Sequence, residues 1–201
     1  MFLRNLRTRW ILLCAIAVLP ALGQEPDSQR LTESGNVEMA GQNVPYIIRR
    51  LPLNAFPDLP SGVADQLDQR HCLIPQTYEA HHPENVVHAS LERAGSSDWA
   101  VLCSVDGDVS LLVFFGNASA RPAVLASVSE KDRLQRHNSS GVLGFDWAID
   151  PASPEAVHQA QSGMDRKPPK PDHDALADIV IDRKTIYRFY TKGKWTLLDM
   201  P

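Results

Sequence analysis

The chain has 201 residues, with 20 lysines and arginines against 24 aspartates and glutamates, which gives a formal net charge of −4. An acidic balance argues against nucleic acid or an anionic lipid surface as the main partner, because both need a basic protein face. The apolar fraction of 43% is ordinary for a folded protein and argues against general disorder.

Residues 1–23 have the order of parts that is typical of a secretory signal peptide. Arginines come first, an apolar stretch follows over 10–22, and small residues stand at its end. That stretch is shorter than the roughly 20 residues of a membrane span, and Cys14 follows two leucines, which does not fit a lipoprotein anchor. We therefore expect a secreted or periplasmic protein without a membrane anchor.

Two cysteines, Cys72 and Cys103, remain once the leader is removed. In an oxidising compartment they have one internal pairing, which predicts a Cys72–Cys103 disulfide. The alternative is two free thiols, one of them a nucleophile.

The first part of the expected mature chain carries few structural signals. Residues 24–44 are polar with little periodicity and indicate a flexible N-terminus. A short strand is expected over 46–48, and the prolines that follow exclude a long helix. A helix is expected over 61–71, with Ser61 as its cap and Val63 and Leu67 on its apolar face.

The centre of the sequence has the pattern of β structure. Apolar runs over 99–103 and 110–115 are separated by Asp106-Gly107, a strong hairpin signal. Both faces of this hairpin are apolar, so we expect both to be covered. Further strands are expected over 85–91, 123–128 and 142–149.

Residues 129–141 are charged and polar and indicate a surface loop. A helix is expected over 154–161, with Ser153 as cap and Pro154 at its first position. The Gly- and Pro-rich segment 163–171 is typical of a linker. Strands are then expected over 179–181, 186–190 and 195–198.

Together these elements predict an α+β fold made mainly of antiparallel β hairpins, with one or two short helices and one disulfide. We expect a single β-rich domain over 45–201, with the linker-like segment inside it.

A weak internal repeat runs through the β regions. Asp98-Trp99-Ala100-Val101 returns as Asp146-Trp147-Ala148-Ile149 and, more loosely, as Asp178-Ile179-Val180-Ile181. An aspartate in front of an apolar strand can close the preceding turn by accepting backbone amides.

The segment 171–181 resembles FG-GAP or VCBS-type repeats, the calcium-loop blades of secreted β-propellers. Asp172, Asp174 and Asp178 match the family's acidic positions, while Ala175 stands where a glycine is usual. The resemblance implies a weak calcium site at these three aspartates, since calcium binds six to eight oxygens. Reasoned from the residues alone, the same aspartates form an Asx-turn entry to a strand. Two hairpins of this kind do not make a propeller, which needs at least four blades.

Two other groups of side chains are chemically suggestive. His71, His81, His82 and His88 lie near Glu79 and Glu84 without any zinc-site spacing, so a solvated, incidental cluster is favoured over a metal site. Trp99, Trp147 and Trp195 lie in strand-like runs, which favours core packing over a ligand platform.

The sequence contains neither a nucleophile elbow nor a phosphate-binding glycine loop. We therefore expect a non-catalytic extracytoplasmic binding or structural module with no cofactor other than weak calcium. The alternatives are a small secreted hydrolase and an inhibitor of a secreted enzyme, the latter presenting a loop such as 129–141. A hydrolase requires a pocket with a convergent base and nucleophile, whereas a binding module requires an exposed aromatic or apolar patch.

Overall fold

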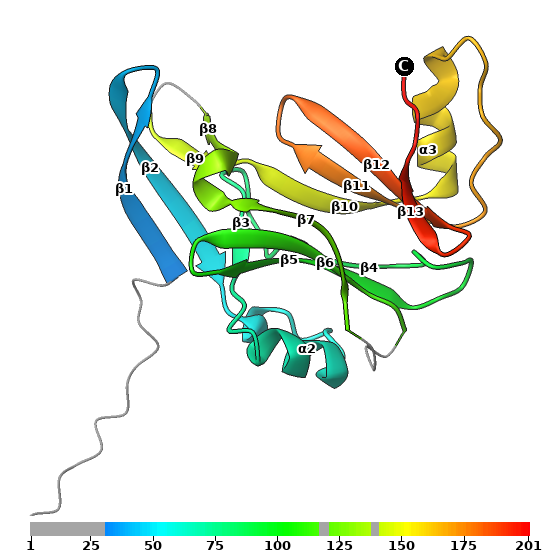
Figure 1. Ribbon diagram of the computed structural model, residues 1–201, viewed down its shortest axis with the longest axis horizontal. Helices are drawn as coiled ribbons and strands as arrows, with labels where there is room; N and C mark the ends of the chain where they lie inside the picture. Colours follow the sequence, from blue (N-terminus) through cyan, green and yellow to red (C-terminus); the bar gives the residue numbers. More distant parts are fainter. Residues whose placement is uncertain (1–30, 117–120, 138–140) are drawn as a thin grey trace, which may run out of the picture.

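The computed structural model describes residues 31–116, 121–137 and 141–201, and the predicted leader 1–23 lies outside these residues. The described chain is β-rich, with two short α-helices, as the sequence predicts (Figure 1). No helix within these ranges is long and apolar enough to cross a membrane.

Three sheets organise the described residues. In the first, β1 pairs with β2, β2 with β9 and β9 with β8, while β3 pairs with the last residues of β2, Arg49 to Leu51. The β2–β9 pair is parallel, and the other pairs of this sheet are antiparallel. The strands are β1 (Thr32–Met39), β2 (Gln42–Leu51), β3 (Ile74–Gln76), β8 (Leu134–Arg136) and β9 (Leu143–Phe145).

The second and third sheets are four-stranded and wholly antiparallel, in the orders β4-β5-β6-β7 and β10-β11-β12-β13. The second contains β4 (Val86–Ala89), β5 (Asp98–Val105), β6 (Asp108–Phe114) and β7 (Ala123–Ser129). The third contains β10 (Trp147–Ala152), β11 (Ala175–Val180), β12 (Lys184–Thr191) and β13 (Lys194–Leu197).

The second and third sheets pack face to face, and one helix covers the outer face of each (Figure 1). Trp147, Leu111 and Leu176 are among the residues buried between the sheets. Helix α2 (Ser61–Asp68) packs on β5 and β6 through Val63 and Leu67, and α3 (Pro154–Ala160) packs on the third sheet through Val157. The β5–β6 hairpin is therefore covered on both faces, as its double apolar pattern predicts.

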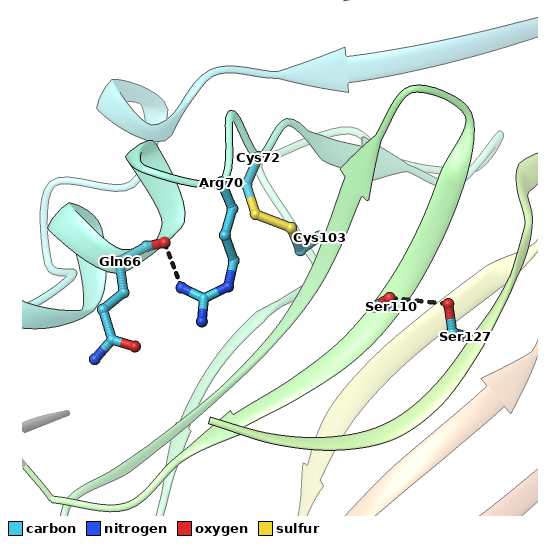
Figure 2. The surroundings of a disulfide bond; sticks show 6 residues. All are labelled: Gln66, Arg70, Cys72, Cys103, Ser110 and Ser127. Atoms are coloured by element: carbon cyan, nitrogen blue, oxygen red, sulfur yellow. Dashed lines mark hydrogen bonds between the residues drawn. A yellow bond between two sulfur atoms is a disulfide. The ribbon is translucent and has the colours of Figure 1, made fainter. Parts of the chain in front are cut away.

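The disulfide joins Cys72, just after α2, to Cys103 in β5 (Figure 2). The two Cα atoms are 5.2 Å apart, inside the range that a disulfide allows. The bond fixes α2 to the second sheet, so the predicted pairing is confirmed.

Local signals explain several boundaries. Asp106 and Gly107 both have positive φ values, 51° and 89°, which makes the tight turn that Asp-Gly predicts. The Ser153 hydroxyl accepts the Ala156 N–H at 3.2 Å and caps α3. Helix α2 differs from expectation: Ser61 is its first residue, Pro60 precedes it, and the predicted cap at Ser61 is wrong.

The expectation of a flexible segment over 24–44 is wrong from Thr32 onward, and residues 24–30 lie outside the described ranges. Thr32–Met39 and Gln42–Leu51 form a hairpin through a turn at Ala40-Gly41, where both φ values are positive. Strand β1 is mostly polar and contributes Val37 to an apolar cluster, which is too little for hydrophobic periodicity to reveal it.

The expectation of a surface loop over 129–141 is wrong for its first half. Residues Glu130–Arg133 form a 3-10 turn and Leu134–Arg136 form β8. Glu130 and Leu134 are buried, whereas Lys131 and Asp132 between them are exposed. The linker-like segment 163–171 contains no strand or α-helix.

Candidate functional site

Two of the three aspartates that resemble a calcium loop, Asp174 and Asp178, accept hydrogen bonds from protein donors, while the Asp172 side chain is 85% exposed. The buried Asp178 accepts the Trp147 indole N–H at 2.7 Å and two N–H groups of Arg188 at 2.9 and 2.7 Å. Asp174 accepts the main-chain N–H of Ser90 at 3.0 Å, and Asp172 contacts His173 at 2.7 Å. No group of three acidic, histidine or cysteine side chains within the described ranges is arranged to hold a metal.

The suggestive histidines are dispersed over the surface. His71 and His88 line two different cavities, while His81 and His82 are exposed in the connection between β3 and β4. Among the tryptophans, Trp147 is fully buried and Trp99 is 7% exposed. Trp195 is half-buried against Phe115 and Tyr190.

The first cavity, which we call the charged pocket, has a volume of about 380 Å³. It lies where β1, β2, the tip of the β5–β6 hairpin and the 3-10 turn at Glu130 meet. Its lining includes Glu33, Arg50, His71, Asp106, Asp108, Glu130 and Lys131.

Most of the charges in this pocket hold the fold together. The buried Arg50 donates to Glu130 through two nitrogens and to Glu33 at 2.8 Å. Glu33 also accepts the Tyr46 hydroxyl at 2.7 Å, and Lys131 lies 3.5 Å from it. The Arg50 and Tyr46 hydrogen bonds lower the pKa of Glu33 to about 2. This network ties β1 and β2 to the segment before β8.

His71 is the one histidine among the described residues that line the charged pocket. His71 has a left-handed backbone, with φ 57°, where the chain turns out of α2 towards Cys72. Its ring makes no hydrogen bond to a serine or a carboxylate in the part of the chain that the structure describes. His71 is therefore not paired with a nucleophile in the way that a histidine base of an acyl-transfer site is.

The second cavity, the aromatic groove, has a volume of about 510 Å³, within the size range of small-molecule sites. One wall comes from the segment between β2 and α2, and the other comes from β4 and β5. The lining residues are Ala55, Phe56, Pro57, Asp58, Leu59, Pro83, Val86, His88 and Trp99.

The floor of the aromatic groove is organised by His88 and Trp99, which are directly opposite each other in β4 and β5. Their rings stack with centroids 4.5 Å apart and an interplanar angle of 12°. The His88 Nε2 atom lies 2.7 Å from the Ser97 hydroxyl, which fixes the orientation of the ring. The exposed imidazole therefore covers Trp99 and presents its own face to the groove.

The sequence predicts core packing for Trp99, which is indeed buried, but it does not predict the groove. Its residues come from three segments that are close only after α2 docks on the second sheet. The prolines between β2 and α2 are the one sequence signal for this groove. They indicate a rigid surface segment, but they do not show which residues pack opposite it.

No protein-family model matches the chain, and no match is found among curated proteins or solved structures.

Proposed function

We propose that the protein is a non-catalytic binding module that works outside the cytosol and holds its ligand in the aromatic groove. The observation that carries this proposal is a preformed concave surface lined by Phe56, His88, Trp99 and two prolines. Ligand sites are typically apolar and aromatic with few polar groups. Asp58 is the one carboxylate among the residues that line this groove in the described ranges.

One feature of the charged pocket favours binding over hydrolysis as the function, and the disulfide supports a place outside the cytosol. The pocket's two buried charged side chains, Arg50 and Glu130, form an ion pair with each other, which is typical of a structural network. The disulfide between Cys72 and Cys103 uses both cysteines outside the leader and suits an oxidising compartment.

The proposal is tested by titrating the folded protein with Nile red, a neutral apolar dye, and following dye fluorescence. Ala55→Trp fills the groove and is expected to weaken dye binding at least tenfold. Val124→Trp is the matched control, because Val124 is 61% exposed on β7, outside the groove. Phe56→Ala serves as a second groove variant if Ala55→Trp does not fold. Equal dye binding by the wild type, the groove variants and the control contradicts the proposal.

A further inference from the structure

Strand β4 is an end strand of the second sheet, and the direction of its main chain follows from its pairing with β5. The Leu102 N–H donates to the Asn85 carbonyl at 3.0 Å. Hydrogen-bonding direction alternates along an antiparallel pair. The main-chain N–H and C=O groups of Val87 and Ala89 therefore point towards β5, as the Asn85 carbonyl does. The N–H and C=O groups of Val86 and His88 therefore point away from the sheet.

These outward groups have no protein partner in the described part of the chain. In the nearby end strand of the third sheet, β10, the outward main-chain groups do have a protein partner. There the Asn85 side chain accepts the Ile149 N–H at 3.1 Å and donates to the Trp147 carbonyl at 3.3 Å. One side chain thus occupies the edge of β10, whereas the edge of β4 keeps donors and acceptors available for another strand.

The same two residues line the aromatic groove with their side chains. A strand paired with β4 would place every second side chain on the face that carries Val86 and His88. Such a side chain enters the groove between β4 and the wall at Phe56. A cavity of about 510 Å³ accommodates a large apolar side chain, and Asp58 on its wall complements a basic neighbour.

We infer that the ligand of the groove is an extended peptide segment of a partner protein, which pairs with β4 and inserts an apolar side chain beside Phe56. A basic side chain two positions along faces Asp58. In this mode of recognition the main-chain hydrogen bonds supply affinity and the groove supplies selectivity. This inference rests on the proposed function and specifies the ligand class of the same site.

The probe is a blocked heptapeptide, acetyl-Thr-Thr-Phe-Thr-Lys-Thr-Thr-amide, titrated into the protein by calorimetry. Two further peptides carry one N-methyl group, either on the phenylalanine or on the threonine that follows it. These two amides point in opposite directions in an extended chain, so only one can donate to β4. We expect one N-methyl peptide to bind at least tenfold more weakly and the other to bind like the parent.

The charge contribution is tested by a double-mutant cycle. Asp58→Asn and replacement of the peptide lysine by norleucine should each weaken binding a few-fold, and their combination should weaken it no further. Val124→Trp should bind the parent peptide normally and Ala55→Trp should not.

The outcomes separate the inference from the function on which it rests. Equal sensitivity to both N-methyl groups, or no saturable peptide binding at millimolar concentration while Nile red still binds, overturns strand pairing and leaves the groove as a small-molecule site. If neither the dye nor the peptide binds, both the inference and the proposed function fail.

Discussion

The Asp98 carboxylate accepts the main-chain N–H of Gly116 at 2.9 Å and so joins the first residue of β5 to the segment after β6. Its other oxygen accepts the N–H groups of Leu91 and Glu92 at 2.9 and 2.7 Å. One fully buried carboxylate thus satisfies amides from two separate loops. The repeat predicts an aspartate that closes the turn before its strand, and Asp98 confirms that role.

Replacing Asp98 should destabilise the second sheet strongly. Asp98→Ala leaves three main-chain donors without their acceptor, and each buried donor of this kind costs about 1–3 kcal/mol. We expect the free energy of unfolding to fall by about 3 kcal/mol or more in urea denaturation. Asp165→Ala, at an exposed position, is the control and should unfold like the wild type. Equal midpoints for the two variants would contradict the prediction.

The parts of the fold that the sequence predicts are those specified by neighbouring residues. Alternation and the Asp106-Gly107 turn identify the β5–β6 hairpin, and Ser153 with Pro154 identifies the start of α3. The disulfide follows from the two cysteines that lie outside the predicted leader. Each of these signals is local or has a single possible partner.

The parts that the sequence does not predict depend on distant polar pairs. Strand β1 and the turn at Glu130 are stabilised by Arg50, which lies 17 residues from Glu33 and 80 from Glu130 in the chain. A charged residue that becomes buried through such a partner looks like a surface residue in the sequence. The aromatic groove is hidden for the same reason, since its walls come from segments far apart in the chain.

The Arg50–Glu130 pair provides a test of this stabilisation. Arg50→Met should lower the free energy of unfolding by about 3–5 kcal/mol, because it leaves the buried Glu130 carboxylate without its cation. The double variant Arg50→Met with Glu130→Leu should recover most of that loss, since it removes both charges. Urea denaturation compares the two. A double variant no more stable than Arg50→Met would show that the stranded charge is not the cause.

The disulfide should contribute mainly by restricting the unfolded chain. Cys72 and Cys103 are 31 residues apart, and a loop of that size corresponds to roughly 3–4 kcal/mol. The variant with serine at both positions should lose this amount relative to the oxidised protein, and the reduced wild type should match it. Two thiols that react with iodoacetamide in the unreduced, unfolded protein would refute the bond itself.

Glu33 should make stability depend on pH in the acidic range. Its folded pKa is about 2, below the ordinary value of 4.5, because Arg50 and Tyr46 donate to its carboxylate. A depressed folded pKa stabilises the protein fully above pH 4.5, and the contribution is lost as the pH falls towards 2. The melting temperature of the wild type should therefore drop more steeply over this interval than that of Glu33→Gln. Parallel curves for the two proteins would exclude this linkage.

Gly144 in β9 should not tolerate a side chain. A Cβ atom there would lie 2.5 Å from the Cβ atom of Tyr78, whose ring stacks on His137 with centroids 4.3 Å apart. Tyr78 Cβ is attached directly to the backbone, so relief requires the chain to move, and overpacking of this kind costs about 1–3 kcal/mol. Gly163→Ala is the matched control, because its new Cβ would meet Pro201 at an ordinary 3.4 Å. Thermal unfolding should show a clear loss for Gly144→Ala and a shift of no more than about 0.5 kcal/mol for the control. A Gly144→Ala protein as stable as the control would mean that Tyr78 and β9 do not approach as closely in solution.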